Sequence, residues 1–143
     1  MTEEKMDFAD AKRSNTTTLA FLGDAVYEVF IRRHVMENAR PNAHAMNRMA
    51  IRYVSAGGQA LAVREMLRED FLSDEEVRLV KRARNHTNTA RPRGATPAEY
   101  KLATGLEALI GGLYLSGERS RLREVVREAI RVIDESADGR KKK

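Results

Sequence analysis

Two acidic side chains stand out because each is the only charge in an apolar stretch. Asp24 lies in LAFLGDAVY, and Glu107 lies in GLEALIGGLYL. We expect both carboxylates to be partly desolvated, which costs free energy unless a cation or hydrogen-bond donors satisfy them. Two such acids that meet in the fold are suitable ligands for Mg²⁺, which binds few protein carboxylates and keeps several waters. Alternatively, each acid faces water or pairs with an arginine at the edge of a helix.

Glycines beside these acids favour a meeting of two helices. The flanking glycines are Gly23, Gly105, Gly111 and Gly112. Glycine in a helix interior is unfavourable by about 1 kcal/mol relative to alanine, so these positions indicate close helix packing. Close packing of two helices would by itself explain the glycines and would give the acids no role, and this alternative stays open. The combination of glycines and acids predicts that Asp24 and Glu107 lie side by side.

A basic segment without acids covers residues 78–93. Its candidate phosphate- and sugar-binding residues are Lys81, Arg82, Arg84, Asn85, Arg91 and Arg93. Arginine and amide side chains suit contacts to a sugar–phosphate backbone. Cations near the end of a helix also complement its dipole, which accounts for Arg82 and Arg84 but not for Arg91 and Arg93 beyond it. The segment therefore predicts a phosphate-facing loop.

Composition restricts the class of protein. The chain has 143 residues, 42% of them hydrophobic, which fits one globular domain with a core. It has no cysteine, so disulfides, thiolate nucleophiles and zinc–cysteine sites are excluded. No apolar run approaches the roughly 18 residues of a membrane span, and residues 1–14 lack the features of a signal peptide. We therefore expect a cytoplasmic protein without a membrane partner. Of the net charge of +5, the tail from Arg140 to Lys143 contributes four positive charges.

Apolar residues recur with helical spacing along most of the chain, and no segment alternates with a period of two, so we predict an all-α fold. The five expected helices run from about Asn15 to His34, Met46 to Leu67, Ser73 to Arg84, Thr96 to Leu115 and Ser120 to Ile133. Capping boxes begin the third and fourth, and Gly57-Gly58 predicts a kink or close packing in the second. We expect a domain over 15–136, an N-terminal extension over 1–14 and a basic tail over 137–143.

Four stretches together resemble the ribonuclease III family. Residues 19–26 (LAFLGDAV) resemble its signature, in which an acid-Phe-Leu-Gly-Asp-Ala stretch supplies catalytic carboxylates, and residues 107–111 (EALIG) resemble the second half of that site. The run YVSA with the following Gln59-Ala60, and RARN at 82–85, are similar to Mini-ribonuclease III, as are residues 100–115. This group has the catalytic domain without a double-stranded-RNA-binding domain. The resemblance covers about residues 15–133.

The resemblance implies the ribonuclease III catalytic fold and a homodimer that cleaves double-stranded RNA with Mg²⁺, leaving 5′-phosphates. Asp24 and Glu107 would be the catalytic and metal-binding residues, and the basic segment would bind RNA. The best-known substrate of the group is the precursor of 23S ribosomal RNA.

The sequence departs from the larger family at two positions. Ala20 and Thr104 stand where that family has acids, so two of four expected carboxylates are missing. Mini-ribonuclease III is similar in having this reduced site. The missing acids also motivate an alternative, an inactive ribonuclease III fold that serves as an RNA-binding or structural module. A helical protein-interaction domain, in which glycines and acids only pack helices, is the other alternative.

Overall fold

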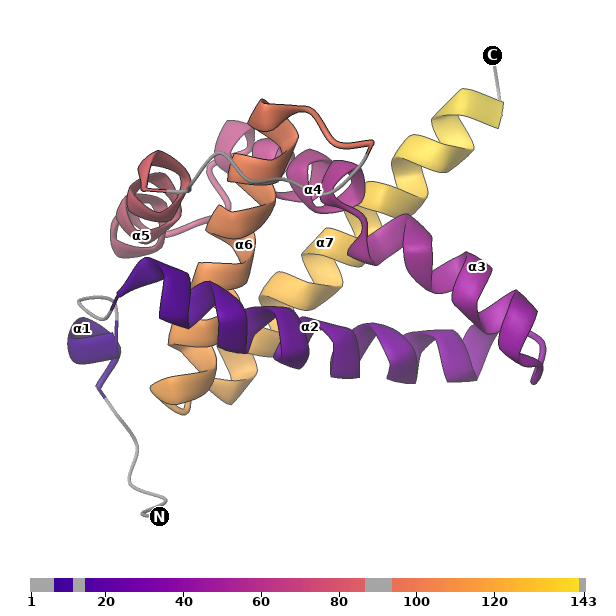
Figure 1. Cartoon of the computed structure of the whole chain (residues 1–143), viewed down its shortest axis with the longest axis horizontal. Helices are drawn as coiled ribbons and strands as arrows, with labels where there is room; N and C mark the ends of the chain where they lie inside the picture. Colours follow the sequence, from indigo (N-terminus) through magenta and orange to yellow (C-terminus); the bar gives the residue numbers. More distant parts are fainter. Residues whose placement is uncertain (1–6, 12–14, 87–93, 142–143) are drawn as a thin grey trace.

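The computed structural model describes residues 7–11, 15–86 and 94–141, and within these ranges the regular secondary structure is entirely helical (Figure 1). The helices are α1 Phe8–Ala11, α2 Thr16–Asn38, α3 Ala43–Val54, α4 Ala56–Arg68, α5 Asp74–Asn85, α6 Pro97–Leu115 and α7 Arg119–Lys141. The predicted all-α class is therefore confirmed. None of these helices, within the described ranges, is both long and apolar enough to span a lipid bilayer.

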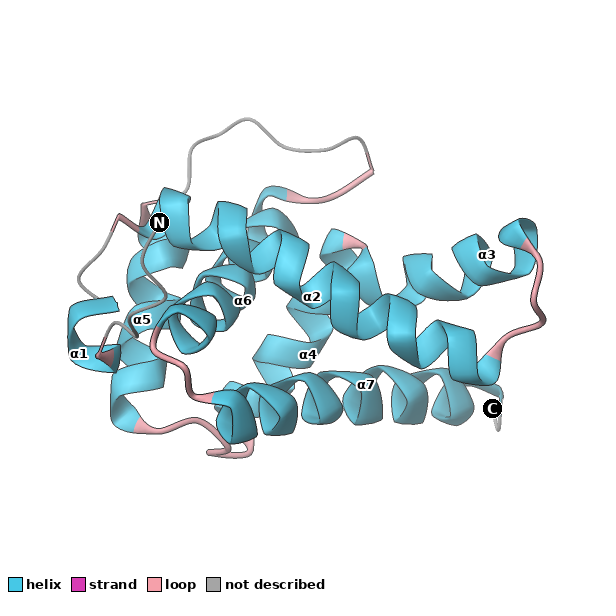
Figure 2. Cartoon of the chain, turned by 90° about the horizontal axis from the view of Figure 1, so that it is seen from below, coloured by secondary structure: helices cyan, strands magenta, loops and turns pink. Residues whose placement is uncertain are grey.

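Helix α6 is the centre of the fold. It packs against α2, α4 and α5, and α7 runs along the molecule against α4 and α6 (Figures 1 and 2). Residues 106–113 of α6 are buried except for Glu107, which is partly accessible. An apolar helix buried on nearly all sides is typical of the middle of a helical core. A single acid in this run therefore lies where the core meets the surface.

Local capping signals set the ends of several helices. The two predicted capping boxes are both formed, with Glu76 N donating to Ser73 Oγ at 3.2 Å and Glu99 N donating to Thr96 Oγ1 at 3.1 Å. Asn15 caps α2, because its Oδ1 accepts hydrogen bonds from Thr17 N and Thr18 N. These side chains satisfy backbone donors that a first helical turn leaves unpaired.

The second predicted helix is wrong as a single element. The chain leaves helical geometry at Ser55, which ends α3 and caps α4. Ser55 Oγ accepts a hydrogen bond from Gly58 N at 3.1 Å, and this bond favours a new helix start over continuation. A β-carbon on Gly58 would overlap the backbone oxygen of Arg52, so this glycine permits the sharp corner. The glycine pair marks the neighbourhood of the break, and the serine sets its position.

A buried ion pair joins α5 to α7. Glu76 is 4% exposed, and Arg121 donates to both of its carboxylate oxygens at 2.9 and 2.8 Å. The same guanidinium donates to the backbone oxygen of Phe71 at 2.8 Å and lies 4.6 Å from the centre of that ring. Glu76 thus serves both the cap of α5 and the attachment of α7.

Candidate active site

The backbones of α2 and α6 touch where the two acids lie. A β-carbon on Gly23 would overlap the backbone oxygen of Glu107, and one on Gly111 would overlap the backbone oxygen of Leu19. These contacts are four residues apart on each helix, so the approach extends over about one turn. Gly23 and Gly111 therefore have the expected packing role, whereas the nearest atoms to a β-carbon on Gly105 or Gly112 belong to Val80 and Leu79 of α5.

The carboxyl groups of Asp24 and Glu107 lie close enough for Asp24 to raise the pKa of Glu107, and they project from the helices whose backbones meet at Gly23 and Glu107. Glu107 is partly buried, as predicted, but Asp24 is exposed. The expected desolvation of Asp24 is wrong because its apolar neighbours on α2 do not all face the core. Phe21, three residues earlier, is 83% exposed. The site is therefore an asymmetric pair, with one acid at the core boundary and one in solvent.

This environment changes the proton affinity of Glu107. Burial, followed by the hydrogen bond and the charge of Asp24, raises the pKa of Glu107 from its ordinary 4.5 to about 8. Two acids that approach this closely cannot both ionise without a free-energy cost, because like charges disfavour the second ionisation. A hydrogen bond from Gln59 acts in the opposite direction and lowers the pKa of Glu107. The pair therefore favours either a proton or a cation between its oxygens.

Gln59 was not predicted as a site residue. It lies on α4, is 2% exposed, and its Nε2 donates to Glu107 Oε2 at 3.4 Å. In the sequence, Gln59 is part of the resemblance to Mini-ribonuclease III and is the polar residue of the run AGGQALAV, which is otherwise small and apolar. That signal cannot identify its partner, because Glu107 lies on another helix.

The positions of the two missing acids contribute no carboxylate. Ala20 is 7% exposed, and Thr104 Oγ1 donates to the backbone oxygen of Tyr100 at 2.9 Å. Glu28 follows Asp24 by one turn, and its Oε2 lies 3.6 Å from Arg32 Nε. Within the part of the chain that the structure describes, no three His, Asp or Glu side chains are grouped to hold a metal. The acidic ligands at this position are therefore limited to the pair.

The predicted RNA-binding residues begin at the end of α5. Lys81 and Asn85 are exposed, and Arg82 and Arg84 are half-buried. Arg91 and Arg93 lie outside the described residues. The structure thus places part of the basic segment beside the start of α6.

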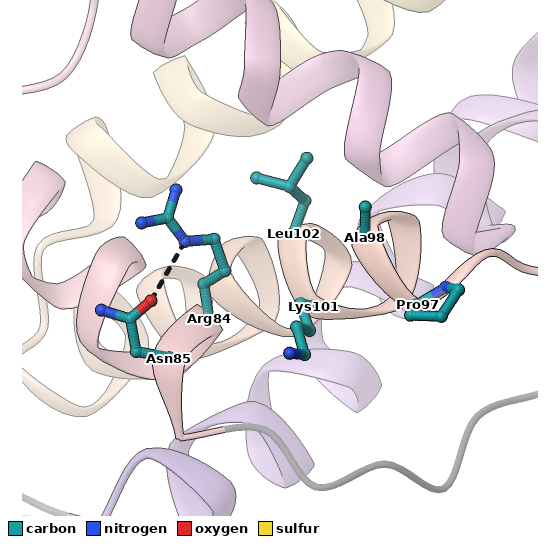
Figure 3. Close-up of a pocket in the computed structure, with 6 residues that line it drawn as sticks. All are labelled: Arg84, Asn85, Pro97, Ala98, Lys101 and Leu102. Atoms are coloured by element: carbon teal, nitrogen blue, oxygen red, sulfur yellow. Dashed lines mark hydrogen bonds between the residues drawn. The ribbon is translucent and has the colours of Figure 1, made fainter.

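A cavity of about 490 Å³ opens between the end of α5 and the start of α6 (Figure 3). Its lining residues are Arg84, Asn85, Pro97, Ala98, Lys101 and Leu102. Arg84 Nε donates to Asn85 Oδ1 at 3.4 Å, which links the two predicted residues (Figure 3). Lys101 was not predicted, because its sequence neighbours give no sign of the basic segment. Folding brings this third polar group to the same cavity.

Large apolar side chains remain exposed along α2. Phe21 is 83% exposed, Val29 60% and Met36 72%. Their spacings of eight and seven residues place them on one side of the helix. Asp24 follows Phe21 by three residues, so only the Phe21 end of this apolar stripe lies beside the acidic pair.

Comparison with known proteins places this arrangement in a family. The model of the Ribonuclease III domain matches residues 17–118. The chain belongs to the ribonuclease III family. It is 41% identical to Mini-ribonuclease 3 of Symbiobacterium thermophilum over 82% of this chain and 88% of that protein. Mini-ribonuclease 3 of Clostridium tetani is 35% identical over 94% of this chain and 88% of its own length.

A solved structure has the same ribonuclease III fold. The crystal structure of a Fusobacterium nucleatum protein, 32% identical to this chain, has a TM-score of 0.72 and covers 82% of this chain and 93% of that one. The predicted resemblance to Mini-ribonuclease III, the fold and endoribonuclease activity are thereby confirmed.

Proposed function

We propose that this endoribonuclease hydrolyses phosphodiester bonds of double-stranded RNA at Asp24 and Glu107, leaving 5′-phosphates and 3′-hydroxyls. The observation that carries the proposal is the backbone contact of Gly23 with Glu107, which brings the carboxyl groups of Asp24 and Glu107 together from helices far apart in the chain. A pair of acids beside an accessible surface suits chemistry on a bound backbone, because Asp24 reaches solvent while Glu107 is anchored in α6.

The acidic pair fits Mg²⁺. Among the side chains that the structure describes, no arginine, lysine or histidine forms an ion pair with Asp24 or Glu107, so their facing oxygens lack a compensating cation. Hard carboxylate oxygens, with water as the other ligands, are a donor set that Mg²⁺ accepts. Asp24 and Glu107 would hold the ion. When bound, it supplies phosphate polarisation and a lower pKa for the attacking water.

The basic residues bind the RNA backbone in this proposal. Lys81, Arg82, Arg84, Asn85, Arg91 and Arg93 contact phosphates and sugars, and Lys101 joins them through the cavity that it shares with Arg84. The A-form major groove is too narrow for side chains to read, so these contacts recognise the shape of the duplex rather than its sequence.

A second copy of the chain covers the apolar stripe of α2. Exposed apolar side chains that recur on one helix face favour burial against a partner, and Phe21, Val29 and Met36 provide such a face. In a symmetric dimer this face would meet its own copy, with an acidic pair near each end of the contact. Light scattering of the purified protein is expected to give the mass of a dimer; a monomer at micromolar concentration contradicts this part.

The proposed cellular substrate is the 23S ribosomal RNA precursor, cut in the duplex formed by its ends. The test is incubation of the purified protein with long duplex RNA and with a transcript of this precursor stem, first with Mg²⁺ and then with a chelator. Cleavage that requires Mg²⁺ and leaves 5′-phosphates supports the proposal. A protein that shifts the RNA in a gel but never cuts it overturns the proposal in favour of a binding module.

A further inference from the structure

Gln59 places a buried amide against the acidic pair. The residue lies in the first turns of α4 and is 2% exposed, and its NH₂ group makes two hydrogen bonds. One reaches the backbone oxygen of Val54 at 3.1 Å, and the other reaches Glu107 Oε2 at 3.4 Å. A single side chain thus connects the corner between α3 and α4 with the buried acid of α6.

The orientation of this amide is determined by its partners. A backbone carbonyl and an ionised carboxylate, the form of Glu107 that binds a cation, can only accept, whereas the NH₂ group of a glutamine has two hydrogens to donate. Val54 is the last residue of α3, so its carbonyl lies where a helix leaves its acceptors unpaired. Turning the amide over would set its oxygen against two acceptors. The donor that faces Glu107 is therefore held in place by the helix end.

Stability alone does not account for an amide at this position. Gln59 Oε1 is buried and has no hydrogen-bond partner among the residues described. A buried acceptor without a partner costs free energy, and an apolar side chain would fill the same space without that cost. An apolar residue would lack two donors, the one that pairs the Val54 carbonyl at the end of α3 and the one directed at Glu107, and only the second reaches the acidic pair.

We propose that Gln59 is a positioning residue that holds the Glu107 carboxylate toward Asp24, so that the pair binds a divalent cation. The inference rests on the proposed function in one respect, that this pair is the cation site. Groups that hydrogen-bond metal ligands orient them, and their loss commonly weakens metal affinity or activity roughly 10–100-fold. Gln59 stands in this relation to Glu107.

The test uses Gln59→Met, which keeps the length of the side chain and removes both donors. The probe is Mn²⁺ alone, bound to the purified protein without RNA and followed by electron paramagnetic resonance. We expect the affinity for Mn²⁺ to fall roughly 10–100-fold. Cleavage by the variant should recover with excess Mg²⁺, while the KM for RNA stays unchanged. Wild-type affinity for Mn²⁺ in the variant overturns the proposal.

Ser55→Ala is the matched control. It removes the cap of α4 beside Gln59, and Ser55 makes no hydrogen bond to Glu107 among the described residues. We expect this variant to melt at a lower temperature while binding Mn²⁺ as the wild type does. An equal loss of Mn²⁺ affinity in both variants would mean that the junction of α3 and α4 affects the site only through the stability of the fold. That result overturns the positioning role of Gln59.

A measurement on the wild-type chain covers the case in which Gln59→Met does not fold. Gln59 is the only glutamine in the sequence, so ¹⁵N labelling of glutamine side chains gives one pair of NH₂ signals. Mg²⁺ should shift these signals as it binds, and binding without a shift overturns the proposal. Both binding measurements omit RNA. A chain that binds the cation through Gln59 and Glu107 but leaves duplex RNA intact would contradict the proposed function alone.

Discussion

The backbone oxygen of Glu107 occupies the space in which a β-carbon of Gly23 would lie. Helices usually pack with their axes 8–10 Å apart, separated by side chains. Here the absence of a side chain lets α2 meet the backbone of α6, one residue before Asp24. The distance between the two acids thus depends on a residue with no functional group.

Gly23→Ala is expected to separate α2 from α6. The added methyl group meets backbone that cannot turn aside, so we expect a loss of about 1–3 kcal/mol in the free energy of unfolding, despite the better helix propensity of alanine. The rate of RNA cleavage should also fall, because the two acids move apart. Urea denaturation and cleavage rates on duplex RNA measure the two effects.

Gly57→Ala is the control for this substitution. The nearest atom to a β-carbon there is Glu99 Oε2 at 3.4 Å, the end of a flexible side chain. Stability should stay the same or rise slightly. A Gly23→Ala protein with wild-type stability and activity would show that the two helices can move apart without consequence.

Asp24→Asn and Glu107→Gln each remove one proposed metal ligand while keeping the shape of the side chain. Metal catalysis contributes several kcal/mol to transition-state stabilisation, so we expect cleavage to slow roughly a thousandfold or more. Binding of duplex RNA in a gel-shift assay should be largely retained. Glu37 is an exposed acid on α2, the helix that carries Asp24, and the control variant Glu37→Gln should cleave RNA at the wild-type rate. Cleavage by either site variant at close to the wild-type rate refutes the assignment.

The stability of the metal-free protein should fall as pH rises. Burial and Asp24 raise the pKa of Glu107 from 4.5 to about 8, so between these values the folded chain holds a proton that the unfolded chain has lost. The free energy of unfolding therefore decreases with increasing pH through this window. Glu107→Gln, which stays neutral, should lack this contribution and melt at a higher temperature than the wild type at pH 8.

Thermal melting between pH 4 and pH 8.5 in chelator measures this dependence. Mg²⁺ should raise the wild-type melting temperature at pH 8, because a ligand that binds only the folded state stabilises it. The same pH slope in the wild type and in Glu107→Gln would mean that this carboxyl group titrates normally.

Arg84→Ala and Lys101→Ala should each weaken RNA binding through loss of a phosphate contact. The slope of log affinity against log salt concentration should become shallower by about one unit per contact, because fewer counterions are released. Fluorescence anisotropy with a short RNA duplex in chelator measures this without cleavage. Arg127→Ala, an exposed residue on α7 outside this cavity, should keep the wild-type slope. Unchanged slopes in the first two variants would place the RNA elsewhere.

Arg121→Met should destabilise the fold by about 3–5 kcal/mol, because it leaves the buried carboxylate of Glu76 without its cation. Arg68 pairs with Glu65 on the surface, where its side chain is 70% exposed, and Arg68→Met should cost less than about 1 kcal/mol. Chemical denaturation of the two variants compares a buried and an exposed pair directly. Similar small losses would mean that the attachment of α7 depends on its apolar face alone.

The sequence by itself determined the helical class, most helix boundaries and the caps. Serine or threonine followed three residues later by glutamate predicted the starts of α5 and α6, and both boxes are formed. Such signals act between residues within one turn, so they can be read from neighbours in the chain. The prediction of one helix across Ser55 failed for a related reason. Apolar residues keep their helical spacing on both sides of Ser55, although the backbone leaves helical geometry there.

Only the tertiary structure decided how the site is composed. Asp24 and Glu107 come from different helices, Gln59 reaches Glu107 from a third, and Lys101 shares a cavity with Arg84. The exposure of Asp24 also depended on which face of α2 meets the core. Contacts between distant residues follow from how helices pack, and packing is the sum of many weak interactions that no short stretch of sequence contains.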